Sequence, residues 1–306
     1  MIIFNENRLL DKIKGALYGV ATGDALGAPL EFMSAEGIEK THGRVTEMIG
    51  GGWLHLTPGE VTDDTQMTLD VARGIVENPE DPVPAIGRNF IEWAKSGPKD
   101  IGSTCALAIQ YAITREATSA EKWHYCAAMA HRNLGGRSAG NGALMRTIYP
   151  ALYYANPIKR AKAVDAIARM THFSQASVDI CQDYCDAVHA AIFGGNPIQT
   201  ISHRYYEPGK APTGYVVDTW SNAIECIINT ETFEDAIVEA VNRGGDADTV
   251  AAITGGLAGA YYGFENIPER WVIRLDLKLQ QELDKLAEIA CKANHDFYER
   301  KFSGKM

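Results

Sequence analysis

The sequence predicts an all-α protein. Apolar residues recur every three or four positions along most of the chain, which is typical of helices that turn one face toward a core. Runs with strand-like alternation are scarce. The loops are marked by Pro, Gly and bulky residues, charge does not shift across them, and no segment repeats at a fixed period. We therefore expect residues 1–306 to form a single domain.

Taken from the N-terminus, the expected elements begin with a strand-like run at 44–56, which three successive glycines interrupt as a hairpin turn or loop. A helix is predicted behind the "TDDT" of 62–65, and a small-residue apolar run at 249–264 predicts a helix buried within the protein. Loops are expected at 78–84, 96–103, 134–142 and 194–214. Three further helices follow from apolar stripes: Ile158, Ala161, Val164, Ile167 and Ala168; Trp220, Ala223, Ile224, Ile227 and Ile228; and Leu275, Leu279, Leu283, Leu286, Ala290, Ala293 and Phe297.

Charge and composition exclude several classes of function. The formal net charge is -10, which argues against nucleic acid as a partner, because such binding needs Lys and Arg to neutralise phosphates. The run 249–264 is shorter than the roughly 20 apolar residues of a membrane span, and charged residues interrupt the N-terminal segment, so we expect a cytoplasmic protein. The six cysteines are expected to be reduced and buried; Cys181 and Cys185, four positions apart, leave a soft-metal site as the alternative.

Two acidic clusters stand at the predicted starts of helices. The alternative to a functional role is capping, since oxygen side chains accept the free N–H groups there, and Asp63 with Gln66 resembles a capping box. Capping uses only one side chain, however, and adjacent carboxylates repel unless a cation lies between them. Hard divalent ions such as Mg²⁺ and Mn²⁺ favour carboxylate and hydroxyl oxygens, and two of them about 3.5–4 Å apart can share a carboxylate. The six candidate metal ligands are Thr62, Asp63, Asp64, Asp246, Asp248 and Thr249.

Five segments together resemble the ADP-ribosylglycohydrolase family. They are "GDALGAPLEF" (23–32), "IGGGWLHLTPGEVTDDTQMTL" (49–69), "AGNGALMR" (139–146), "GYVVDT" (214–219) and "GGDADT" (244–249). The likeness runs in order from about residue 12 to 272 and is strongest toward the branch that activates dinitrogenase reductase by removing ADP-ribose from an arginine. The resemblance implies an all-α orthogonal multi-helix fold, with a dinuclear Mg²⁺ or Mn²⁺ centre on the six residues named above.

The same resemblance implies further site residues. Glu31 matches a glutamate that reaches the metals or their water, and Asp100 matches a residue near the scissile bond. These two residues are the catalytic candidates. The resemblance does not say which of them is the general acid and which is the general base. Ser103 stands where the family usually has Asn. The substrate-binding candidates are Gly102, Ser103, Thr104, Gly140, Asn141, Gly142, Met145, His172 and Tyr215. Structural alternatives remain: a surface charge for Glu31, an Asx-turn for Asp100, a helix-starting loop for 140–142, a buried structural donor for His172 and a half-buried aromatic for Tyr215.

The implied activity is metal-dependent hydrolysis of the N-glycosidic bond between ADP-ribose and an arginine of a target protein. Dinitrogenase reductase is the implied target, a PII-type signalling protein the implied regulatory partner in nitrogen fixation, and a monomer the expected state. Two alternatives stay open. One is hydrolysis of another linkage, to serine, to acetate as O-acetyl-ADP-ribose, or in a nucleotide; the other is a catalytically silent ADP-ribose-binding relative.

Overall fold

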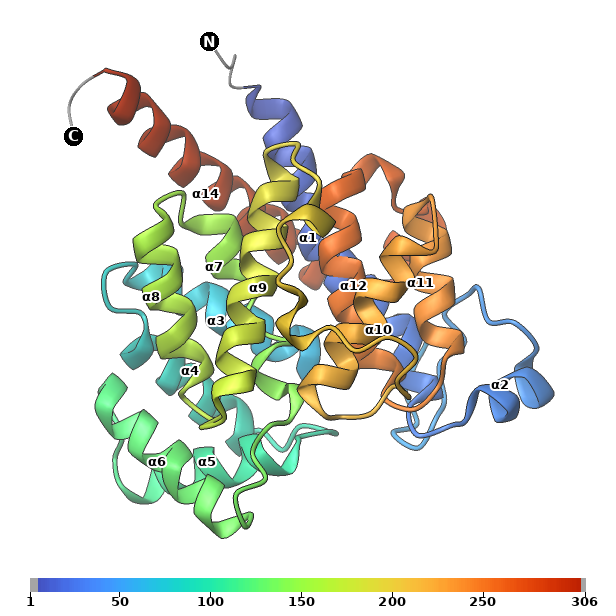
Figure 1. Ribbon diagram of the computed structural model, residues 1–306, viewed down its shortest axis with the longest axis horizontal. Coiled ribbons are helices and arrows are strands. Elements are labelled where there is room, and N and C mark those ends of the chain that lie inside the picture. Colours follow the sequence, from blue (N-terminus) through green and yellow to red (C-terminus); the bar gives the residue numbers. More distant parts are fainter. Residues whose placement is uncertain (1–4, 304–306) are drawn as a thin grey trace.

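A computed structural model describes residues 5–303, and over these residues the fold is all-α (Figure 1). The long helices are α1 (Glu6–Gly27), α2 (Ala35–His42), α3 (Asp63–Glu77), α4 (Val83–Lys95), α5 (Ser103–Thr114), α6 (Ala120–Asn133), α8 (Pro157–Ala168), α9 (Gln175–Ile192), α10 (Val216–Ile228), α11 (Phe233–Asn242), α12 (Ala247–Tyr262) and α14 (Leu277–Phe302). Two shorter α-helices are α7 (Ile148–Tyr153) and α13 (Glu269–Val272). The 3-10 turns are η1 (Ala28–Leu30), η2 (Asn141–Ala143), η3 (Pro197–Gln199), η4 (His203–Tyr205) and η5 (Phe264–Asn266).

Helices α1 and α12 lie side by side in the centre of the molecule and run antiparallel (Figure 1). Small residues spaced four apart form a ridge on each helix, so that the two backbones touch. A Cβ atom added to Gly19 would lie 2.0 Å from the Gly255 carbonyl oxygen, and one on Gly23 would lie 2.1 Å from that of Ala251. This approach needs residues without a side chain. It places the C-terminal end of α1 against the N-terminal end of α12.

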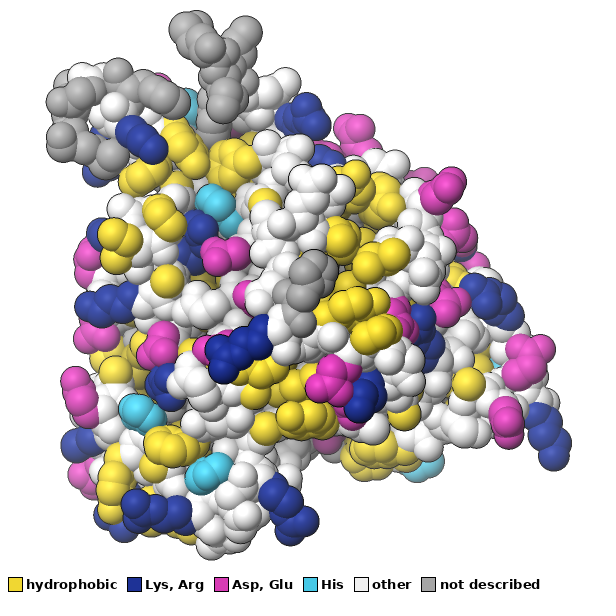
Figure 2. All heavy atoms as spheres, viewed as in Figure 1, with side chains coloured by type: hydrophobic (Ala, Val, Ile, Leu, Met, Phe, Trp, Pro, Cys, Tyr) yellow, Lys and Arg dark blue, Asp and Glu magenta, His cyan; other side chains and the backbone are white. Residues whose placement is uncertain are grey.

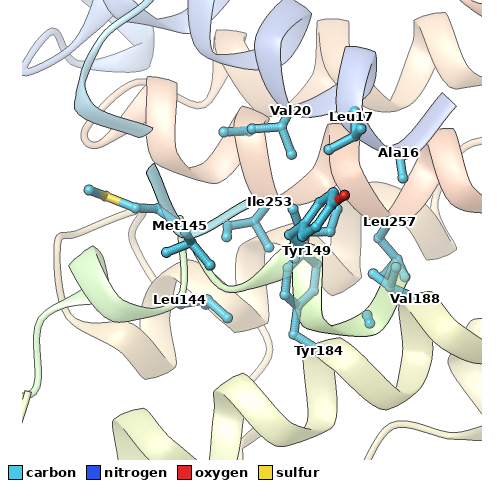
Figure 3. Close-up of a cluster of buried hydrophobic side chains, with 14 of the residues drawn as sticks. Ala16, Leu17, Val20, Leu144, Met145, Tyr149, Tyr184, Val188, Ile253 and Leu257 are labelled. Atoms are coloured by element: carbon cyan, nitrogen blue, oxygen red, sulfur yellow. The ribbon is translucent and has the colours of Figure 1, made fainter. Parts of the chain in front are cut away.

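Helices α7 and α9 close the core against this central pair. Figure 3 shows Leu17 and Val20 of α1 facing Ile253 of α12, with Tyr149 of α7 and Tyr184 of α9 across from them. All five side chains are buried, and they belong to one continuous apolar cluster that also contains residues of α14. The six cysteines are buried and free of disulfides, as the sequence predicts.

The predicted helices are confirmed, with three misassigned stripe residues. Ile158 is 80% exposed and Ile228 is 51% exposed, because each lies at the end of its helix, beyond the neighbouring elements. Ala161, one turn into α8, is exposed as well. The strand-like run at 44–56 is a loop with a single bridge between Gly51 and Leu56, and residues 5–303 contain no strand. Nor does any helix among them combine the length and apolar character needed to cross a membrane.

Charged side chains are mixed on the visible surface. Figure 2 shows Lys and Arg interspersed with Asp and Glu over α6, α8, α9 and α10, without a broad basic area on this face. Such a surface provides no extended phosphate-binding track there, in agreement with the net charge.

Candidate active site

A cavity of about 430 Å³ lies where the starts of four helices meet. Its wall is formed in part by the N-terminal ends of α3, α5 and α12. Gly214, which precedes the N-cap residue of α10, also lines it. Most of the residues singled out from the sequence line it: Glu31, Asp63, Asp100, Gly102, Ser103, Thr104, Gly140, Asn141, Gly142, Met145, His172, Asp246, Asp248 and Thr249. The remaining three are Thr62 and Asp64, which are buried, and Tyr215, which is 46% exposed and pairs its backbone with Gly140.

The two acidic clusters come together in this cavity with Glu31 and Asp100. One carboxylate oxygen from each of Glu31, Asp100 and Asp248 lies within 4.8 Å of the other two. Thr249 Oγ1 of α12 donates to Asp64 Oδ2 of α3 at 3.3 Å, which joins the two clusters directly. The geometry does not separate the predicted catalytic pair from the predicted metal ligands, because Glu31 and Asp100 share an ion-sized space with Asp248.

The carboxyl groups of this cluster are costly to ionise without a cation. Burial, followed by the charges of neighbouring carboxylates, raises the pKa of Asp63, Asp64 and Asp248 well above the ordinary value. Burial also raises the pKa of Glu31 to about 7, against the opposing hydrogen bond from Trp53. Among the residues that line the cavity there is no Lys or Arg to offset these charges.

A divalent cation fits this group of residues. Asp64 Oδ1 is buried and has no hydrogen-bond partner among the described residues, although a buried carboxylate oxygen normally has one. Carboxylate and hydroxyl oxygens form the donor set, which suits Mg²⁺ or Mn²⁺ rather than a soft metal. Uncompensated negative charge and an unpartnered carboxylate oxygen are both features expected of residues that bind divalent ions.

The capping interpretation of the two clusters is wrong. The cap residues are Thr62 for α3 and Asp246 for α12, and neither side chain bonds to the N–H groups of its own helix. Gln66 does not complete a capping box, because its amide donates to the carbonyl of Val61 and accepts from Trp93. The carboxylates are therefore available to one another across the cavity.

Asp24 of α1 takes over the capping of α3, a role that the sequence analysis missed. Its carboxylate accepts the backbone N–H groups of Thr62 at 3.0 Å and Thr65 at 3.1 Å. It also accepts both of their hydroxyl groups, at 2.9 and 2.5 Å. Burial raises the pKa of Asp24 to about 6. Because the start of α3 is fastened to α1, and α1 is packed on α12, the positions of Asp63 and Asp248 depend on each other.

Asn141 holds the other acidic cluster. Its side-chain amide donates to Asp246 Oδ2 at 2.7 Å and to Thr219 Oγ1 at 3.0 Å. Its backbone N–H bonds to the carbonyl of Gly214 at 3.0 Å, beside the bridge between Gly140 and Tyr215. The amide nitrogen thus orients Asp246, and the glycines on either side of Asn141 face the cavity.

A buried network fixes the protonation of His172. Arg146 Nη2 donates to Thr171 Oγ1 at 2.8 Å, and Thr171 Oγ1 lies 2.8 Å from His172 Nδ1. The threonine hydroxyl has one proton and two lone pairs, and we assign its proton to the bond with Nδ1, which leaves the ring proton on Nε2. Burial lowers the pKa of His172 to about 3, so the ring is neutral. Nε2–H has no partner among the described residues and adjoins Gly140 and Gly142, where it can donate to a ligand oxygen.

Thr171→Val should disturb this network without changing the shape of the side chain. We expect His172 to lose its fixed tautomer and the affinity for ADP-ribose, the ligand that the family resemblance implies, to fall about 3- to 10-fold, because one oriented donor is lost. Nitrogen NMR of the His172 ring and a binding titration measure the two effects, and Thr171→Ser should largely restore both. An unchanged tautomer in the valine variant would contradict the assignment.

Two aromatic residues at the rim of the cavity were also missed. Trp53 Nε1 donates to Glu31 Oε2 at 2.7 Å, and the rings of Trp53 and Phe32 lie 5.6 Å apart. Both residues belong to segments quoted for the resemblance, but only the folded chain places them beside each other and beside Glu31. Arg146 was missed for the same reason: the sequence gives no sign that this arginine is fully buried.

These features define a class of protein: the chain belongs to the ADP-ribosylglycohydrolase family, whose profile matches residues 5–300. Enzymes of this family hydrolyse ADP-ribosyl linkages. The predicted family and the predicted all-α fold are thereby confirmed.

Two relatives and one solved structure are similar to this chain over most of its length. The ADP-ribosyl-[dinitrogen reductase] glycohydrolase of Rhodospirillum rubrum is 36% identical over an alignment of 286 positions that covers 89% of this chain and 93% of the relative. The ADP-ribosylarginine hydrolase Tri1 of Serratia proteamaculans is 33% identical over an alignment of 310 positions that covers 92% of this chain and 80% of the relative. A solved structure described as an ADP-ribosylglycohydrolase-related protein complex superimposes with a TM-score of 0.78 at 28% identity, and covers 94% of this chain and 99% of its own.

Proposed function

We propose that this protein is a divalent-metal-dependent hydrolase that removes ADP-ribose from a modified arginine of a target protein. The observation that carries the proposal is the meeting of the acidic starts of α3 and α12 with Glu31 and Asp100 in one cavity. The names of the two relatives support the arginine linkage and make ADP-ribosylated dinitrogenase reductase the first target to test.

The residues of the cavity divide the work of binding and proton transfer. Asp63, Asp64, Asp246, Asp248 and the two threonines would hold two ions, which, when bound, supply positive charge that fixes ribose hydroxyls and activates water. The glycines at 140 and 142 let the backbone approach the diphosphate, and His172 Nε2–H donates to a ligand oxygen.

Glu31 is placed to exchange a proton near neutral pH. Its pKa is about 7 in the metal-free protein and would be lower beside a bound cation, so its role rests on its position with Asp100 and Asp248 around the cavity. Asp100, whose pKa is also raised by burial, is the second carboxyl group beside the reacting centre. Proton transfer to the leaving guanidine and from the attacking water needs two such groups or one that acts twice.

Release of ADP-ribose from ADP-ribosyl-arginine tests the proposal. The protein is purified, stripped with a chelator and assayed before and after Mn²⁺ is restored, with ADP-ribosyl-serine and O-acetyl-ADP-ribose in parallel. We expect turnover of the arginine substrate only with the metal. Turnover that survives chelation would reject the metal-dependent scheme, and turnover of the serine or acetyl substrate alone would move the assignment to another linkage.

The stabilising effect of Mn²⁺ should grow with pH. In the metal-free protein the acidic cluster has raised pKa values, so between about pH 4 and 7 the folded chain binds more protons than the unfolded chain. Stability from this source is present at low pH and is lost as pH rises through the folded-state values. Bound cations offset the loss. The Tm difference between Mn²⁺-loaded and chelated protein is therefore expected to widen from pH 5 to pH 8; a difference that narrows would contradict it.

A further inference from the structure

An exposed aromatic pair borders the cavity. Phe32 is 71% exposed and Trp53 is 49% exposed, and their rings lie 5.6 Å apart with 38° between their planes. Both residues line the cavity. Large aromatic side chains that share one exposed edge of a cavity are typical of a binding surface, because leaving them in water gives up their favourable burial.

The backbone of Phe32 and the ring of Trp53 are both held in place. Phe32 has a φ of 64°, a left-handed conformation that a bulky residue seldom adopts. Its N–H bonds to the carbonyl of Gly245 at 2.7 Å, and the Gly245 N–H bonds back to Met33 at 2.7 Å. Trp53 is fixed through its indole N–H to Glu31. Strain that the surrounding structure maintains at the edge of a site points to a role for the side chain it presents.

The position of Phe32 and Trp53 relative to the carboxylates indicates which part of a bound substrate they would contact. Glu31 precedes Phe32 in the chain and bonds to Trp53, so the rings adjoin the carboxylates that would surround the reacting sugar carbon. The glycine loop at 140–142 and His172, which would receive the diphosphate and ribose, lie on other segments. The part of the substrate left for the aromatic pair is the group released from the sugar.

We propose that Phe32 and Trp53 form the leaving-group subsite and hold the planar guanidinium of an ADP-ribosylated arginine against their ring faces. Guanidinium groups stack on aromatic rings, and the attraction is greater where water is excluded. Glu31 and Asp100 beside the rings add negative charge that favours a cationic group over a neutral one. This inference rests on the proposed hydrolysis of an arginine linkage and specifies how that linkage is selected.

Phe32→Leu tests the subsite, because leucine keeps an apolar side chain but has no ring face. We expect KM for ADP-ribosyl-arginine to rise about tenfold, while the Kd for ADP-ribose, which lacks the guanidinium, changes less than about twofold. Phe32→Tyr should restore most of the loss. Tyr125→Leu is the matched control, since Tyr125 is an exposed aromatic residue on α6 outside the cavity; it should leave both constants as in the wild type.

The outcomes separate this inference from the function on which it rests. An unchanged KM for Phe32→Leu, or an equal loss of affinity for ADP-ribose, would overturn the leaving-group subsite while the hydrolase assignment stands. A wild-type protein that binds ADP-ribose but does not cleave ADP-ribosyl-arginine in Mn²⁺ would reject the proposed function, and the subsite with it.

Discussion

Asparagine in place of Asp248 is expected to lower kcat/KM for ADP-ribosyl-arginine by at least about 10³-fold and, at the same time, to stabilise the metal-free protein. The amide has almost the same shape and keeps an oxygen for the hydrogen bond that Asp248 Oδ1 now accepts from the N–H of Thr249. It removes one negative charge from a group that lies with Glu31 and Asp100 around an ion-sized space. The loss corresponds to about 4 kcal/mol of transition-state stabilisation, within the range of a metal that is no longer held.

The gain in stability follows from the same charge. Burial and the neighbouring carboxylates raise the pKa of Asp248, so its ionised form opposes folding at neutral pH unless a cation is bound. Tm is measured in chelator alongside activity in Mn²⁺. Asp183→Asn is the control, because burial also raises the pKa of Asp183 to about 6, on α9 and away from the cavity; it should keep full activity. A less stable and inactive Asp248→Asn would indicate a structural role instead.

Alanine in place of Gly19 is expected to destabilise the protein by about 3 kcal/mol or more and to weaken Mn²⁺ binding. The new methyl group would lie 2.0 Å from the carbonyl oxygen of Gly255 and 2.6 Å from its carbon. Both neighbours are backbone atoms of α12, so no side chain can rotate away and the helices must separate. Separation also moves the end of α1, with Asp24, from the start of α12, with Asp248.

The matched control is Gly37→Ala, the same substitution in the exposed helix α2. A Cβ there meets only the Ser34 hydroxyl, at 3.2 Å, and alanine has the higher helix propensity, so the change should stay within about 1 kcal/mol. Chemical denaturation of the two variants with the wild type gives the comparison. Equal stability of Gly19→Ala and Gly37→Ala would show that α1 and α12 are not packed as closely as described.

The sequence predicts the helices and most of the residues that meet in the cavity, for two physical reasons. Helical periodicity is local, so stripes such as that of 220–228 can be identified without the rest of the chain. Neighbouring carboxylates repel one another, so two such clusters at helix starts are unusual enough to mark a candidate site, and the structure brings them into one cavity. The spacing of four from Gly15 to Gly27 was also visible and could have indicated a closely packed helix pair.

The sequence could not show which distant residues contact one another in the folded chain. Asp24 caps α3 from another helix, and the buried Arg146 donates to Thr171; both contacts exist only once distant segments are packed. Likewise, a family resemblance assigns Glu31 and Asp100 to catalysis, but only the three-dimensional arrangement places their oxygens with that of Asp248. The ends of stripes, such as Ile158, fail because periodicity does not show where the neighbouring element stops.

The most direct test is to count and characterise the ions that the folded chain binds. Chelator-stripped protein is titrated with Mn²⁺, its bound metal is determined, and its electron paramagnetic resonance spectrum is recorded, with the double variant Asp64→Asn, Asp248→Asn beside it. The account predicts two ions per chain with an exchange-coupled spectrum, which the double variant loses while it stays folded. Weak binding of isolated ions, equal in the wild type and the variant, would contradict it.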